Sequence, residues 1–219
     1  MNEPDNSNPY QAPSAPSEIP VQLVPEGGKV KDPSLLGWIL LGLLAVSTTF
    51  DVIQHVALVF GGDEEMVSEG GGLLVFVIYF VIFLCWSYRV HANARRIDPS
   101  VQTVSPGWAV GSYFVPIVCF WVPAQAMIQT SRISGTSVSL VWIWWLGNIS
   151  LLLIGVAVLA FFLSQSADEI MENFADVGWM DHATIVAQVA LAWVEGCLVL
   201  GLNRVHRELA TRTETVRAA

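Results

Sequence analysis

Glu195 is the residue of this sequence whose type and surroundings point most directly to chemistry. It lies within residues 184–203, an apolar stretch that contains no other charged side chain. Counted as a helix from Thr184, it lies roughly 16 Å along the axis, near the middle of a hydrocarbon core of about 30 Å. A charge at that depth costs at least a few kcal/mol unless it is paired or neutralised. We therefore expect a neutral carboxyl group at this position.

Asn148 reaches a similar depth in another apolar stretch, roughly 14 Å from Ser139. Two interpretations follow. In the structural one, a neutral Glu195 hydrogen-bonds Asn148 or Ser47 and joins two helices. In the functional one, Glu195 is a protonatable site in a channel or transporter. A polar, water-accessible cavity that reaches Glu195 would favour transport, and a dry, fully packed core would favour the structural interpretation.

Asp51 and His55 stand four residues apart, and so share one face of a helix near one end of a further apolar stretch. An Asp and a His could hold a proton or a metal ion. Two ligands do not complete a metal site, and no third is evident. The spacing therefore predicts a paired Asp and His, and we expect no metal and no cofactor.

A basic cluster follows the second apolar stretch. Its members are Arg89, His91, Asn93, Arg95 and Arg96. One role for it is to set the topology and contact lipid headgroups, worth about 1 kcal/mol per cation near anionic lipid. The other is to anchor residues 106–130, where Pro116 and Pro123 leave backbone carbonyls without helical donors. In that case Arg89, Asn93 or nearby tryptophans such as Trp108 donate to those carbonyls.

Enzyme signatures are absent from the sequence. It contains no HExxH, GxSxG, Walker or CxxC motif. The basic residues are few and border apolar stretches, so a nucleic-acid surface is not expected. We expect a protein that is not an enzyme.

The elements that must position these residues are four apolar stretches long enough to cross a bilayer. The chain is 53% hydrophobic and only 13% charged, unlike a soluble domain. A membrane domain is expected over residues 35–207, with an all-α fold. It follows a proline-rich tail, residues 1–34, that is expected to be disordered, and precedes a cytoplasmic tail, residues 208–219. The expected spans are residues 35–60, 73–97, 139–163 and 184–203.

The distribution of charge predicts the orientation of these spans. All ten Lys and Arg residues lie in the tails or beside the central segment, whereas residues 63–69 and 168–181 hold nine carboxylates and no Lys or Arg. Short loops rich in Lys and Arg stay in the cytoplasm. Both termini are therefore expected to be cytoplasmic, and the two acidic connections are expected to face outward.

Residues 106–130 are uncharged and long enough to cross, which leaves five spans as an alternative. A fifth span would place the arginines of the C-terminal tail outside. Pro116 and Pro123 instead suit a re-entrant segment, whose irregular backbone the four spans must shield. One further pattern is the tripeptide Arg-Val-His, which ends the second span at His91 and the fourth at His206. It raises the hypothesis of a parallel duplication.

Several motifs of the central region carry a family resemblance. They are Trp86-Ser87-Tyr88-Arg89, Ala92-Asn93-Ala94-Arg95, Ser105-Pro106-Gly107-Trp108-Ala109-Val110-Gly111, Phe114-Val115-Pro116-Ile117, Pro123 with Gln125 and Met127, and the tryptophans 142, 144 and 145. In order and spacing, residues 35–207 resemble the bacterial membrane family called domain of unknown function 4328. The family usually has an Asn at Cys119 and Arg-Pro-Tyr at residues 122–124. The resemblance implies a protein of the bacterial inner membrane and brings no known activity.

The sequence as a whole favours a small, non-enzymatic inner-membrane protein acting in scaffolding, assembly or sensing. The alternative is a channel or transporter with a protonatable site at Glu195. The expected partners are the lipid bilayer and a cytoplasmic protein that binds the tails. The oligomeric state, and any substrate, stay open.

Overall fold

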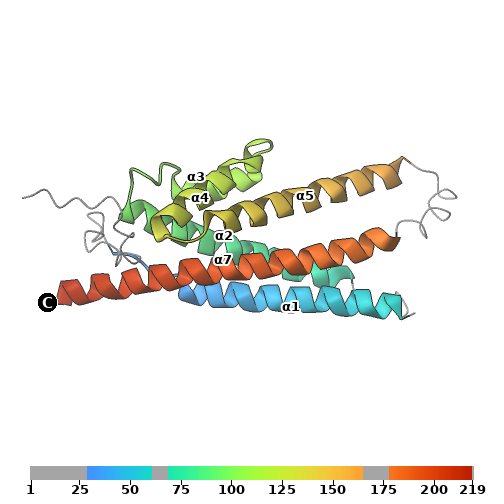
Figure 1. Ribbon diagram of the computed structural model, residues 1–219, viewed down its shortest axis with the longest axis horizontal. Helices are drawn as coiled ribbons and strands as arrows, with labels where there is room; N and C mark the ends of the chain where they lie inside the picture. The colour runs from blue at the N-terminus through green and yellow to red at the C-terminus, as the bar shows by residue number, and fades with distance from the viewer. Residues whose placement is uncertain (1–28, 61–68, 165–177, 219) are drawn as a thin grey trace, which may run out of the picture.

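The computed structural model describes residues 29–60, 69–164 and 178–218, and these residues form helices without any strand. The elements in chain order are α1 (Ser34–Val59), α2 (Glu69–Ile97), α3 (Pro106–Gly111), η2 (Ser112–Phe114), η3 (Val118–Phe120), α4 (Val122–Ser134), α5 (Val138–Leu163) and α7 (Gly178–Ala218) (Figure 1). The predicted all-α fold is confirmed for these ranges. Most of the expected disordered tail and of the two acidic connections lies outside the described residues.

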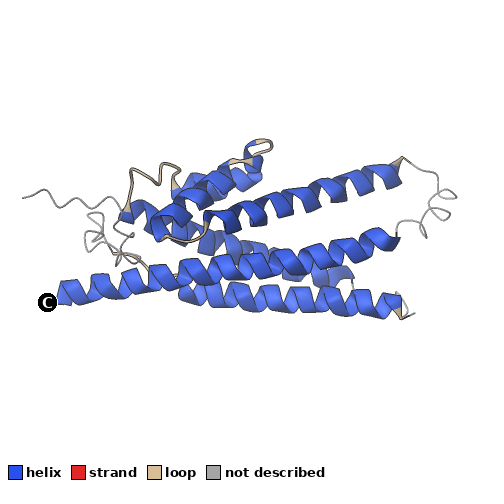
Figure 2. Ribbon diagram, in the orientation of Figure 1, coloured by secondary structure: helices blue, strands red, loops and turns tan. Residues whose placement is uncertain are grey.

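Four long helices, α1, α2, α5 and α7, run lengthwise through the molecule (Figure 2). Each contains a stretch long and apolar enough to cross a membrane: Ser34–Ala57, Leu74–Ile97, Val138–Phe161 and His182–Thr215. These stretches agree closely with the first three expected spans. The fourth extends further, because residues 204–218 continue α7 instead of forming a separate tail.

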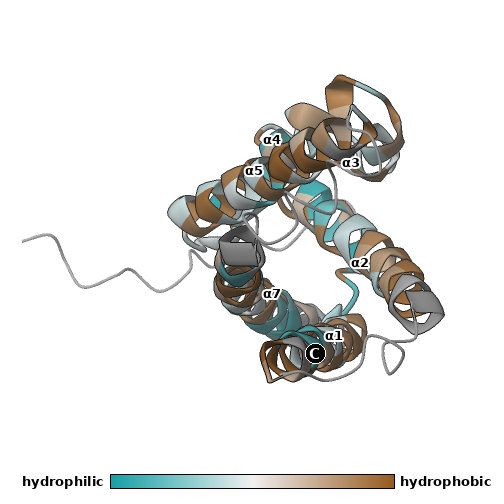
Figure 3. Cartoon of the chain, turned by 90° about the vertical axis from the view of Figure 1, so that its right-hand side faces the viewer, coloured by the Kyte–Doolittle hydropathy of each residue, from teal (hydrophilic) through white to brown (hydrophobic). Residues whose placement is uncertain are grey.

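The outer surfaces of these helices are apolar. Large hydrophobic side chains are exposed along all four, among them Val46 on α1, Phe76 on α2, Leu152 on α5 and Trp193 on α7. Coloured by residue hydropathy, the long helices are hydrophobic over much of their length (Figure 3). Soluble monomers rarely expose continuous apolar patches of this kind. The described helices therefore have the composition and surface of a multi-pass membrane protein.

The helices form a ring. α1 packs between α7 and α2, α5 packs on α7, and α4 lies between α2 and α5. We call the end where α1 begins and α4 and α7 end the basic end. α4 has 13 residues, which is about 20 Å of helix, beside about 39 Å for the 26 residues of α5. It therefore fills the ring only at the basic end.

The segment from α3 to α4 turns back on itself (Figure 1). Its two limbs, Pro106–Phe114 and Val118–Ser134, are bent by 115° relative to each other. At the turn, Ile117 has φ 70°, and the Val118 N–H donates to the Pro116 carbonyl over 2.8 Å. This is a tight γ-turn, in a backbone region that β-branched residues rarely adopt.

The two prolines of this segment act differently, which corrects the expectation that each breaks a helix. Pro116 does interrupt the helical backbone at the turn. Pro123 instead lies in the first turn of α4, where its missing N–H costs nothing. At the other end of α4, Gly135 adopts φ 65° and its N–H donates to the Arg132 carbonyl, as is usual at a helix C-terminus.

Candidate functional site

Glu195 lies on α7 with 7% of its surface exposed and accepts hydrogen bonds from two other helices. The Tyr79 hydroxyl of α2 donates to one carboxyl oxygen. The Trp144 indole N–H of α5 donates to the other over 3.3 Å. Three of the four long helices thus meet on one carboxyl group. Gly147 lets α5 and α7 approach closely beside it, since a Cβ there would lie 2.2 Å from a methyl carbon of Leu191 and would force that side chain to move.

The prediction that Glu195 bonds Asn148 or Ser47 is wrong. The Asn148 amide donates to the Trp144 carbonyl of its own helix over 2.7 Å, and the Ser47 hydroxyl donates to the Leu44 carbonyl over 3.1 Å. Short polar side chains in apolar helices commonly bond to their own backbone in this way. The sequence did carry one signal for the correct partners. A buried carboxyl group needs hydrogen-bond donors, and the long side chains of Tyr79 and Trp144 can reach such a group from neighbouring helices.

A cavity of about 520 Å³ extends from Glu195 between α1, α2, α5 and α7. Its walls are mainly aliphatic and aromatic, with polar side chains among them. The polar lining side chains are Ser47, Thr48, Asp51, Tyr79, Asn148, Gln188 and Glu195. Among the described residues that line it there are two carboxyl groups and no Lys, Arg or His. The volume is typical of pockets that hold small ligands. It occupies the part of the ring that α4 does not reach.

The expected pair of Asp51 and His55 is not formed. Asp51 lines the cavity. His55 instead faces α7, where its Nε2 lies 2.7 Å from Nδ1 of His182, with the two rings edge to face. The neighbouring helix thus supplies a partner that helical spacing could not reveal. Within the described ranges, no group of three or more His, Cys, Asp or Glu residues could hold a metal ion.

Arg89 and Asn93 hold the N-terminal segment instead of residues 106–130, so that prediction is wrong. The Asn93 side chain accepts from the Lys31 N–H over 3.0 Å and donates to the Lys31 carbonyl over 2.6 Å. Arg89 donates to the Asp32 carbonyl over 3.2 Å. We call residues 29–33 the N-terminal strap. Its backbone crosses the basic end and takes these side chains as partners because it lies outside any helix.

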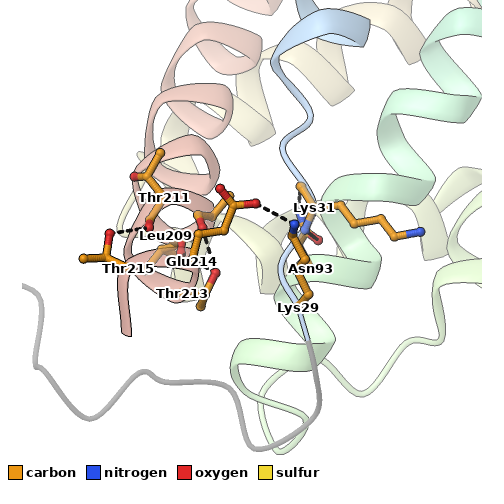
Figure 4. A network of polar contacts seen from close by, with 9 residues as sticks. Lys29, Lys31, Asn93, Leu209, Thr211, Thr213, Glu214 and Thr215 are labelled. Carbon is orange, nitrogen blue, oxygen red and sulfur yellow. Dashed lines mark hydrogen bonds and ion pairs between the residues drawn. The ribbon is translucent and has the colours of Figure 1, made fainter. Parts of the chain in front are cut away.

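Two further contacts fix the strap. Val30 is fully buried against Ile97, Leu209 and Ala210. The Lys29 ammonium lies 2.5 Å from a carboxylate oxygen of Glu214, near the end of α7 (Figure 4). The strap thereby connects α1 to both α2 and α7.

A tryptophan does bond the backbone of the turned segment, as the alternative prediction had it. The Trp145 indole donates to the Phe120 carbonyl over 3.1 Å. Trp108 has no such role: its backbone N–H donates to the Ser105 hydroxyl at the start of α3, and 47% of the residue is exposed.

The histidines of the two Arg-Val-His tripeptides, on α2 and α7, both contact α4. His91 Nδ1 lies 2.7 Å from the Thr130 hydroxyl, which itself donates to Gln102, so this nitrogen carries the hydrogen. His206 Nε2 lies 2.9 Å from the Ser134 hydroxyl. Both imidazoles are buried.

Over the described residues, fold and site together define an all-helical protein with four helices long and apolar enough to cross a membrane, and with a cavity of mixed polarity among them. The chain belongs to the family described as Domain of unknown function (DUF4328), whose family model matches residues 64–204. The match includes Tyr79, Trp144 and Glu195, and it begins after α1, later than the resemblance over residues 35–207 suggested. No curated protein and no solved structure matches the chain significantly.

Proposed function

We propose that this protein spans the bacterial inner membrane four times, with both termini in the cytoplasm. The apolar outer surface of the four long helices supports the embedding. The confinement of Lys and Arg to the tails and the flanks of the central segment supports the orientation. In this arrangement residues 106–134 form a re-entrant segment that enters and leaves at the basic end. The bend of 115° between its two limbs supports a segment that returns to the same side of the membrane, and not one that crosses it.

Within that membrane body, we propose that the protein binds and conducts or carries a small solute, as a non-enzymatic channel or transporter. The observation that carries this proposal is the cavity of about 520 Å³, mainly apolar but lined by seven polar side chains, that reaches the buried carboxyl of Glu195. A scaffold needs no such cavity, and leaving one unfilled among apolar helices is destabilising. We therefore place the transport role ahead of scaffolding.

The lining indicates which solute the cavity suits. Two carboxyl groups, Asp51 and Glu195, lie along its wall, and the described residues of the lining include no cationic side chain. Phe50, Phe76 and Tyr79 add aromatic surface, on which cations are favourably placed. Charge and aromatic content therefore favour a small cation, organic or hydrated, over an anion. A protonatable Glu195 would then exchange its proton for the charge of the solute.

The second candidate function is a scaffold, which one specific observation favours. The strap crosses the basic end, where the buried Val30 and the backbone bonds between Lys31 and Asn93 connect α1 to α2 and α7. A rigid body with polar tails at this end suits a cytoplasmic protein partner.

Thiol labelling distinguishes the two functions. In a chain lacking Cys85, Cys119 and Cys197, single cysteines are placed at Asn148, which lines the cavity, and at Leu152, one turn away on the exposed face of α5. We expect a cationic methanethiosulfonate reagent to label Asn148→Cys faster than an anionic one, and Leu152→Cys to resist both. Adding Glu195→Gln should reduce the preference for the cation. Absence of labelling at a folded Asn148→Cys would indicate a dry core and favour the scaffold.

A further inference from the structure

A second cavity, of about 610 Å³, lies at the basic end and is separate from the one that reaches Glu195. It is bounded by the strap and by α1, α2 and α3. Most of its lining comes from a single face of α2: Cys85, Tyr88, Arg89, Ala92 and Arg96 recur at spacings of three and four residues. From Cys85 to Arg96 this face runs about 16 Å along the helix.

The cavity changes character along its length. The part nearer the middle of α2 is apolar, with Leu36 of α1, Leu84 of α2 and Val110 of α3 beside the exposed Cys85. Its other part, toward the end of α2, carries Lys31, Arg89 and Arg96. A hydrophobic pocket with cations at the rim has the polarity of a lipid lying in a membrane, with its charged head at the interface and its chains below.

The three cations have no carboxylate partner in the described part of the chain. The ion pairs found there join Lys29 to Glu214 and Arg204 to Glu208. The nearby Asp32 carboxylate accepts from the Ser34 N–H at the start of α1 and does not line the cavity. Arg89 and Arg96 donate to uncharged acceptors, the Asp32 carbonyl and the Asn93 amide. Each guanidinium keeps further N–H donors for an anion.

The strap brings the third cation to the cavity. Asn93 bonds the backbone of Lys31 and not its side chain, so the ammonium group stays available to the cavity that Lys31 lines while the strap is fixed beside α2. Lys31 and Arg89 thus line the same cavity although they come from the strap and from α2. The bond from Arg89 to the Asp32 carbonyl also holds the strap in place. Such preorganisation lowers the cost of binding an anion.

We propose that this cavity binds an anionic phospholipid, with its phosphate held by Lys31, Arg89 and Arg96 and an acyl chain along Leu36, Leu84 and Val110. Charge-assisted hydrogen bonds from Lys and Arg suit a phosphate oxygen. The apolar part favours a lipid over free phosphate, because a free anion would leave that part of the cavity unfilled. The inference shares with the proposed function only the membrane embedding, and it is independent of the role of Glu195.

The test compares lipids that differ in the headgroup alone. The full-length protein, purified in a neutral detergent, is titrated with dioleoyl phosphatidylglycerol or dioleoyl phosphatidylcholine, and binding is followed by native mass spectrometry and thermal melting. We expect phosphatidylglycerol to bind more tightly and to raise the melting temperature more. Lys31→Gln and Arg96→Gln should each weaken its binding about fivefold. The matched control is Arg95→Gln, which removes an exposed charge from the adjacent position of α2 outside the cavity.

Other outcomes would overturn the proposal. Equal binding of the two lipids, or equal loss in Arg95→Gln and Arg96→Gln, would reduce the cluster to a general basic surface. An equal response to inorganic phosphate would identify a site for a free anion. A second readout uses the native cysteines: phosphatidylglycerol should slow alkylation of Cys85, which lines the cavity, and leave Cys119 and Cys197 unchanged. Uniform protection of all three would contradict a lipid in this cavity. Lys31→Gln retains the backbone bonds to Asn93, so its folding is preserved.

Discussion

His91 and His206 bind hydroxyl groups one helical turn apart on α4, although 115 positions separate the two histidines in the sequence. His91 lies 2.7 Å from the hydroxyl of Thr130, and His206 lies 2.9 Å from that of Ser134. The histidines end two identical tripeptides, on α2 and on α7. The repeated tripeptide therefore has a structural counterpart, since both copies hold the short helix that fills the basic end. Whether it arose by duplication stays a hypothesis.

Removing either hydroxyl should destabilise the protein. Thr130→Val and Ser134→Ala leave a buried imidazole nitrogen without its partner, a loss of about 1–3 kcal/mol each. Thermal melting in detergent measures the effect. Gln125→Ala, an exposed position of the same helix, is the control. If the hydroxyl variants melted together with Gln125→Ala, these two bonds would not hold α4.

Glu195 should tolerate the loss of its charge better than its reversal. Glu195→Gln retains the size of the side chain and an acceptor for Tyr79 or Trp144, so the fold should survive nearly intact. Glu195→Lys buries an ammonium group against two donors and should impair assembly. Membrane expression and thermal melting compare the two. Equal tolerance would show that the position faces water or lipid headgroups.

The Tyr79 hydroxyl should contribute measurably to stability. Tyr79→Phe retains the ring and removes the donor, which leaves a buried oxygen of Glu195 unpaired at a cost of about 1–3 kcal/mol. Tyr88→Phe makes the same chemical change at a half-exposed tyrosine on the same helix. We expect a lower melting temperature for Tyr79→Phe alone. In the double variant with Glu195→Gln, the effect should differ from the sum of the single effects.

The strap should detach when Asn93 is replaced. Asn93→Leu removes both bonds to the backbone of Lys31, and Arg89→Ala removes the bond to Asp32. Hydrogen exchange at the Lys31 amide should become faster in both variants, and more so for Asn93→Leu. Arg212→Ala, an exposed arginine of α7, should leave that exchange unchanged. Slow exchange in Asn93→Leu would mean that Val30 and Lys29 hold the strap by themselves.

The four-span topology is tested by labelling single cysteines in intact cells. Met66→Cys lies in an acidic connection and Arg217→Cys lies near the C-terminus. With four spans, a membrane-impermeant reagent should reach position 66 from outside, and position 217 only after permeabilisation. Labelling of position 217 in intact cells would require a fifth span and would remove the re-entrant segment.

The sequence by itself determined the helical architecture, the family and the expected orientation. The four long helices follow from apolar stretches of sufficient length, a property of each segment alone. The interruption of the helix near Pro116 also follows from a local property, because proline removes a backbone hydrogen-bond donor. The orientation can likewise be predicted from the sequence, because the effect of each Lys or Arg depends only on its position beside a span.

Only the tertiary structure decided which side chains meet. Glu195 was recognisable from its depth, but its donors, Tyr79 and Trp144, come from helices whose rotation and neighbours no local pattern specifies. Likewise Arg89 and Asn93 were recognisable as polar groups at a helix end, yet they bond the strap because it crosses their face of α2. The cavity itself exists because α4 is shorter than the helices beside it and ends the close packing part-way along the ring. Hydropathy and charge are sums over single segments, whereas hydrogen-bond partners and cavities depend on how the segments pack together.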